Sequence, residues 1–146
     1  MDGHTREDGY TFLQSDYEST PGHSVTTDLD QDHDAASVNM GSRWRMPTRA
    51  ECEELISNCT VVLTEEDGTR VFRFTSRING ASILVPAAGF SGNGAWQGIG
   101  NSGRLWLATI NTNGAAFRLR LNANATDVGA ILDRHDGFSV RGVQDP

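Results

Sequence analysis

A run of alternating aspartates is the part of the sequence most similar to a metal site. Residues 28–34 read DLDQDHD, and oxygen ligands at every second position can wrap one calcium ion. An EF-hand loop would need Gly at its sixth position and Glu at its twelfth, where His33 and Asn39 stand. Two interpretations remain, a weak cation site or a solvated acidic loop whose last residue, Asp34, caps a helix. We favour the loop and assign no metal or other cofactor.

Nucleophilic catalysis would need a Ser, Cys or Thr beside a His that a third group orients. None of the four histidines lies in a recognisable nucleophile motif, and we expect all of them on the surface: His4, His23, His33 and His135. Cys52 and Cys59 are seven residues apart, which on a helix separates their Cα atoms by about 10 Å, beyond disulfide reach. We therefore expect two buried free thiols and no catalytic residues.

Charge argues against a nucleic-acid ligand. The 146 residues carry a net charge of −7, and all twelve basic residues are arginines. Residues 1–40 hold nine acids and one arginine, whereas the rest of the chain holds ten acids and eleven arginines without a basic cluster in the sequence. A chain without clustered basic side chains neutralises few phosphates, and so releases few of the counterions whose release drives nucleic-acid binding. No stretch approaches 18 apolar residues, so we also expect no membrane insertion, and the first residues lack a secretory signal.

The order of the predicted elements indicates one α+β domain over residues 1–146. Residues 1–33 form a polar, loop-rich leader with one short strand near 9–13. Asp34 and Gly41 are a cap and a stop for a short helix, and Thr48 with Glu51 forms a capping box that begins an amphipathic helix over about 48–58. Antiparallel strands follow, with a long Gly/Asn loop at 89–103 among them; the strands are predicted at 71–75, 81–86, 104–109, 116–121 and 138–143.

The last third of the chain combines a strand with clear alternation and a segment without periodicity. Phe117, Leu119 and Leu121 alternate with Arg118 and Arg120, so one face of this strand belongs to the core and the other to water. Residues 122–133 show neither period 2 nor period 3.6. We interpret them as exposed positions that the fold does not dictate, with outward apolar residues that mark a binding surface. A plain connecting loop is the alternative.

Several motifs resemble one known family. Residues 34–36 (DAA), residues 41–48 (GSRWRMPT), Glu51 and residues 54–55 (EL) resemble the core motif of the Fibrobacter succinogenes major paralogous domain family. Three further motifs follow in that family's order, namely LVPAAGF at 84–90, GNSGRLW at 100–106 and GFSVR at 137–141. The family is similar to C-type lectin-like folds, and occurs in Bacteroidetes surface proteins and in variable proteins diversified by retroelements of phage and bacteria.

The resemblance implies a rigid C-type lectin-like scaffold that displays a variable ligand-binding surface within residues 107–136. Its partner would be a protein or glycan receptor on a host-cell or bacterial surface, and the domain would lie on a virion or a bacterial cell. The implied scaffold residues are Trp106, Phe117, Leu119, Leu121, Arg134, Gly137, Phe138 and Val140. The implied displayed residues are Leu107, Ile110, Thr112, Asn113, Arg118, Arg120, Asn122, Asn124, Asp127, Ala130, Ile131, Leu132, Asp133, His135 and Asp136.

We expect the core to contain Trp44, Leu55, Phe72, Phe74, Trp106, Phe117, Leu119 and Phe138. Binding energy would come from a few anchors among the displayed residues, namely Ile110, Arg118, Arg120, Leu132 and His135. The EPN, QPD and WND motifs of calcium-dependent sugar binders do not occur. Two alternative functions remain: an assembly module of a bacterial surface protein, and an enzyme similar to the formylglycine-generating enzyme, whose chemistry needs reactive cysteines.

Overall fold

The computed structural model describes residues 27–92, 94–111 and 115–145. These residues form a mixed α+β fold, as predicted. Its elements are β1 (Thr27–Asp28), α2 (Ala35–Met40), α3 (Arg49–Asn58), β2 (Cys59–Glu66), β3 (Thr69–Ser76), β4 (Ser82–Pro86), β5 (Phe90–Gly92), β6 (Ala95–Gln97), β7 (Ser102–Ile110), β8 (Ala116–Asn122) and β9 (Ala125–Ile131). No helix among the described residues is long and apolar enough to cross a bilayer. The predicted strand at 9–13 lies outside the described residues.

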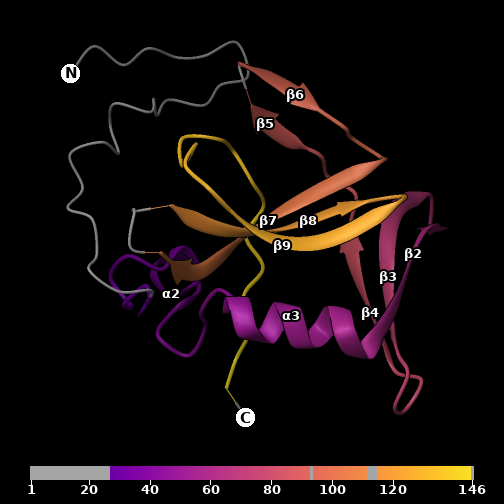
Figure 1. Ribbon diagram of the computed structural model, residues 1–146, viewed down its shortest axis with the longest axis horizontal. Helices are drawn as coiled ribbons and strands as arrows, with labels where there is room; N and C mark the ends of the chain where they lie inside the picture. Colours follow the sequence, from indigo (N-terminus) through magenta and orange to yellow (C-terminus); the bar gives the residue numbers. More distant parts are fainter. Residues whose placement is uncertain (1–26, 93, 112–114, 146) are drawn as a thin grey trace.

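The described strands form antiparallel sheets with the orders β1-β7-β8-β9 and β2-β3-β4, together with the β5-β6 hairpin. Helix α3 packs against β7, β8 and β9 from one side (Figure 1). The β2-β3-β4 sheet stands at the end of α3 where the chain leaves the helix (Figure 1). One face of the β7-β8-β9 sheet is therefore covered by α3 and turned toward the core, and we call the opposite face the outer face.

Both predicted helix starts are confirmed. The Thr48 hydroxyl accepts the Glu51 amide, and the Glu51 carboxylate accepts the Thr48 amide at 2.8 Å, which completes the capping box. Asp34 is buried and accepts the amides of Ala36 and Ser37 at 2.8 and 3.0 Å. It also accepts the amide of Met46 at 2.8 Å, so one carboxylate joins the start of α2 to the segment that leads into α3.

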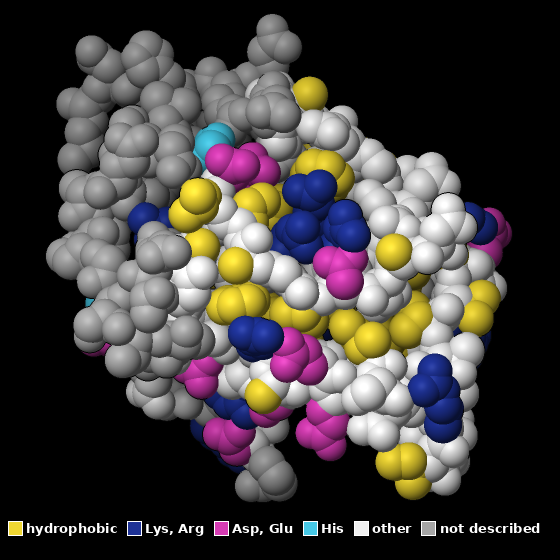
Figure 2. All heavy atoms as spheres, in the orientation of Figure 1, with side chains coloured by type: hydrophobic (Ala, Val, Ile, Leu, Met, Phe, Trp, Pro, Cys, Tyr) yellow, Lys and Arg dark blue, Asp and Glu magenta, His cyan; other side chains and the backbone are white. Residues whose placement is uncertain are grey.

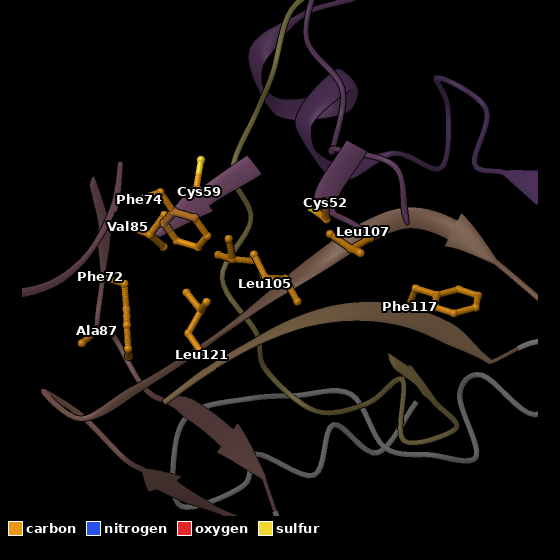
Figure 3. Packing of buried hydrophobic residues seen from close by; sticks show 11 residues of the cluster. Cys52, Cys59, Phe72, Phe74, Val85, Ala87, Leu105, Leu107, Phe117 and Leu121 are labelled. Carbon is orange, nitrogen blue, oxygen red and sulfur yellow. The ribbon is translucent and has the colours of Figure 1, made fainter. Parts of the chain in front are cut away.

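The main core lies between α3, the β2-β3-β4 sheet and the inner face of β7 and β8 (Figure 3). Phe72, Phe74, Phe117 and Leu119 are buried there, as predicted, and Leu55 packs against them. A smaller cluster joins α2 to β7, and the half-buried Trp44 and Trp106 pack against it. Phe138 is also half-buried and stacks on Trp106 with 4.1 Å between ring centroids.

Three predictions of local structure are wrong. Residues 138–143 form isolated bridges rather than a strand, because Ser139 bridges to Leu105 and Val143 bridges to Arg45, so no single partner runs along the segment. The Gly/Asn loop at 89–103 contains the β5-β6 hairpin. Residues 125–131, interpreted as patternless, form β9 and pair with β8 along their whole length. Strand β2 was not predicted either, although the Asp-Gly pair that turns it into β3 is typical of a hairpin.

Candidate functional site

Three arginines meet on the outer face of the β7-β8-β9 sheet. Strand register places Arg104 opposite Arg120, and Arg120 opposite Asp127. The neighbouring row holds Arg118 of β8. Because side chains alternate along a strand and Leu119 faces the core, these four side chains lie on the opposite face. We call Arg104, Arg118, Arg120 and Asp127 the arginine face.

Figure 2 shows the surface over the β7-β8-β9 sheet. Basic side chains gather over the β7-β8-β9 sheet, with hydrophobic side chains beside them and an acidic side chain at their edge. The sequence has no run of basic residues, and this cluster arises only in the folded chain. Arg104 is separated in sequence from Arg118 and Arg120, and only the pairing of β7 with β8 brings them together.

Asp127 forms unequal pairs with its two arginine neighbours. Arg120 Nε and Nη2 lie 2.7 and 2.5 Å from Asp127 Oδ2, so this pair is close. Arg118 Nη1 lies 3.6 Å from Asp127 Oδ1, which is an ion pair but not a hydrogen bond. The Arg120 side chain is 42% exposed, so water screens its pair with Asp127. The Asp127 carboxylate thus accepts a hydrogen bond from Arg120 and none from Arg118.

Arg118 is largely buried without satisfying its donors. Its side chain is 15% exposed. Within the described part of the chain, its Nε and Nη1 atoms are buried and have no hydrogen-bond partner. A Cβ at position 129 would lie 3.6 Å from Nη1, so the guanidinium lies across the bare backbone of Gly129. A buried donor without a partner costs about 1–3 kcal/mol, and folding alone therefore does not explain this arginine.

Arg104 is held by aromatic rings. Its guanidinium carbon lies 3.5 Å from the centroid of Phe90 and 5.2 Å from that of Phe138, which is cation–π geometry. Burial lowers the pKa of Arg104, and the like charge of Arg118 lowers it further. Asp136 acts in the opposite direction and raises it. The arginine face and Asp136 together hold three cationic and two anionic side chains, which leaves one positive charge in excess.

The structure places the predicted displayed residues in different environments. Asn124, Ala130, Leu132 and Asp133 are exposed, and Leu132 is 61% exposed. Six others are intermediate in burial, and these are Arg118, Arg120, Asn122, Asp127, Ile131 and His135. Thr112 and Asn113 lie outside the described residues. Among the predicted scaffold residues, Val140 is exposed, whereas Gly137 exchanges two backbone hydrogen bonds with Ser91.

Three predicted displayed residues are buried, which corrects the prediction for them. Leu107 is 1% exposed because it alternates with Trp106 and joins Leu105 on the side of the main core. Ile110 is buried where β7 pairs with both β1 and β8. Asp136 is buried beside Gly92, because the following residue is bridged to β5. The displayed set is therefore smaller than the resemblance implied.

The prediction that all histidines lie on the surface is wrong for His135. Its side chain is 18% exposed, and its Nε2 atom lies 3.9 Å from Asp136 Oδ1. His33 is exposed, and its Nδ1 atom lies 2.6 Å from Asp30 Oδ1. That contact raises the pKa of His33. His4 and His23 lie outside the described residues.

The carboxylates of the acidic run serve separate partners. Asp28 accepts the hydroxyl of Thr109 at 2.5 Å, Asp30 contacts His33, and Asp34 caps α2. Among the described residues, no three His, Cys, Asp or Glu side chains gather as a metal site would require. The loop interpretation, with Asp34 as a helix cap, accounts for these contacts.

Both cysteines are free and buried, as predicted. Burial raises the pKa of Cys52 to about 12, and Glu51 and Glu53 add to the shift. A thiolate is the reactive form of cysteine, and at neutral pH very little of it forms at such a pKa. Cys52 is therefore a protonated thiol at neutral pH.

Sequence reasoning missed the aromatic support of the arginine face. Phe90 was placed in a loop, and Phe138 and Trp106 were assigned to the core. One available signal was the alternation of residues 104–107, which sets Arg104 and Trp106 on one side and Leu105 and Leu107 on the other. That parity also predicts the buried position of Leu107.

Compared with family models, curated proteins and solved structures, the chain matches none of them. The site is therefore defined by its own geometry. It is an arginine-rich sheet face on an α+β domain, with charged and apolar residues at the solvent side of β8 and β9.

Proposed function

We propose that this domain is a non-catalytic recognition module that binds its ligand through the outer face of the β7-β8-β9 sheet and the turn that follows β9. The observation that carries the proposal is Arg118, whose Nε and Nη1 atoms are buried without a hydrogen-bond partner in the described residues. A ligand that supplied acceptors there would offset a cost that the folded domain alone bears.

The neighbouring residues fit a binding role better than a packing role. Arg120 and Asp127 are half-exposed and contribute little to stability as a screened pair. Leu132, directly after β9, is an exposed apolar residue, and apolar residues beside arginines are typical of interface cores. Inner-face residues of the same strands, such as Leu119 and Leu121, form the main core and hold this surface in place.

The motif resemblance extends this proposal. Under it, the domain has a C-type lectin-like fold, and the surface is the variable region of a retroelement-diversified protein. The domain then serves as a phage or bacterial surface adhesin, and its partner is a protein or glycan receptor on a host-cell or bacterial surface. Support comes from the order of the motifs along the chain and from the helix starts at Asp34 and Thr48, which lie within them.

Sequencing the gene and its flanking DNA in many natural isolates tests this proposal. We expect an adjacent reverse-transcriptase gene and a near-copy of the 3′ end of the gene. We also expect substitutions concentrated at the codons for Arg118, Arg120, Ala130 and Leu132. Codons for Leu119 and Leu121 should be constant, because these residues are buried in the core.

Exposed residues on another sheet provide the matched control. Val62 and Ile83 are exposed on β2 and β4, away from the arginine face. If their codons vary as often as that of Arg120, the variation is ordinary surface drift and the proposal is wrong.

A further inference from the structure

We propose that the ligand of the arginine face is a partner protein that presents closely spaced carboxylates, which pair with the guanidinium groups of Arg118 and Arg104. This inference rests on the proposed function, because it names the ligand chemistry of the same sheet face. The inference applies to a chain that has arginine at positions 104 and 118.

The N–H groups of the arginine face are suited to bind an oxyanion. Arg118 has two buried N–H groups without an acceptor in the described residues, and its one carboxylate neighbour, Asp127, is 3.6 Å away. The guanidinium of Arg104 lies over aromatic rings, which do not replace oxygen acceptors. Arginine presents its donors in a planar fork that matches a carboxylate with two hydrogen bonds. An incoming carboxylate reaches this guanidinium at the 15% of the Arg118 side chain that is exposed, and a turn of the side chain away from Gly129 then brings Nε–H and Nη1–H to it.

Local charge favours the same ligand. The chain has a net charge of −7, and it repels acidic partners at long range. The arginine face is an exception, because three guanidinium groups lie there against Asp127 and the buried Asp136. An acidic partner that binds this domain thus gains its attraction at this face rather than from the molecule as a whole.

The surroundings of the face favour a protein over a sugar. Sugars bind aromatic residues by stacking on a free ring face. Here Arg104 covers one face of the Phe90 ring, and Trp106 and Phe138 cover one face of each other. Two open surface pockets of the described residues, of about 360 and 280 Å³, are lined by other residues than Arg104, Arg118 and Arg120. A sheet face with arginines and a nearby exposed Leu132 resembles a protein interface, in which arginine and apolar anchors combine.

A nitrogen-15 NMR titration of the intact chain tests the inference through the arginine Nε–H signals. The probe is an end-blocked hexaglutamate peptide at low salt, with end-blocked hexaglutamine as its neutral counterpart. We expect hexaglutamate to shift the signals of Arg104 and Arg118 saturably, and hexaglutamine to leave them in place. Equal shifts with hexaglutamine, or no saturable shift with hexaglutamate, would overturn the inference.

Variants identify the responsible side chain. R118Q should weaken hexaglutamate binding at least fivefold, and R120Q, at a half-exposed position, should weaken it by a similar or smaller factor. The matched control is R43Q, which removes the same charge at an exposed arginine between α2 and α3 and should change binding less than twofold. Unchanged binding in a folded R118Q variant contradicts the inference, and if R118Q does not fold, unchanged shifts of the Arg118 signal in the unaltered chain contradict it instead.

A titration of the same arginine signals with inorganic phosphate completes the experiment. If phosphate alone saturates the Arg118 shift as tightly as hexaglutamate, the face is a small-oxyanion site and the inference of a protein partner is overturned. Failure of the titration would remove the acidic partner but not the recognition role. The recognition role fails separately, if natural isolates show no excess of substitutions on this face.

Discussion

Two leucines that the motif resemblance placed together on the variable surface should respond in opposite ways to the same substitution. Leu107 is 1% exposed and packs in the main core, whereas Leu132 is 61% exposed. L107A removes buried methyl groups and leaves a cavity, which costs about 3 kcal/mol of unfolding free energy. L132A removes a side chain that is mostly in water already, and should cost about 0.5 kcal/mol or less.

Urea unfolding followed by tryptophan fluorescence measures both values. For a domain of this size we expect the midpoint of L107A to fall by about 1.5 M urea, and that of L132A to change by no more than about 0.3 M. In a thermal scan the melting temperature of L107A should fall by about 10 °C. A loss below about 1 kcal/mol for L107A, or equal losses for both variants, would refute the burial that separates the core from the displayed surface.

Three further predictions concern the scaffold. D34A leaves the amides of Ala36, Ser37 and Met46 without their buried acceptor and should cost about 3 kcal/mol in urea unfolding, whereas D32A, at an exposed position, should cost little. Arg45 lowers the pKa of Glu51 in the folded chain from its usual 4.5 to about 2. As the pH falls, the Glu51 carboxylate of the unfolded chain is therefore protonated before that of the folded chain. The stability that this pair contributes is present above pH 4.5 and is lost as the pH falls toward 2. Because the Glu51 side chain is 44% exposed, we expect about 1 kcal/mol, and E51Q should remove this part of the pH dependence. Both thiols should resist Ellman's reagent at pH 8 in the folded protein and react after unfolding; rapid labelling of the folded protein would contradict their burial.

Local signals predicted the helices and four strands well. The capping box at Thr48 and the cap at Asp34 are satisfied within a few residues of the chain, so they depend little on distant contacts. The alternation in β8 likewise predicted which of its faces is buried. Such features can be derived from a single sequence because their physical cause is local.

Other features depend on distant parts of the chain. Residues 125–131 mix strand formers with Ala, Asp and Gly, and they become β9 because β8 supplies a hydrogen-bonding edge and Val128 packs on the core. The arginine face depends on the register between β7 and β8, which shifts between Trp106 and Ile110. No pattern within the sequence sets that shift, so the meeting of Arg104 with Arg118 could not be predicted.

We infer that the residues of the arginine face serve binding rather than folding, a claim that the unfolding free energy of R118M decides. Methionine covers Gly129 with a chain of similar length and carries no buried donor, so R118M should be as stable as the unaltered protein or up to about 1 kcal/mol more stable. A loss of about 2 kcal/mol or more would show that Arg118 is needed to hold the fold together, and would contradict the claim.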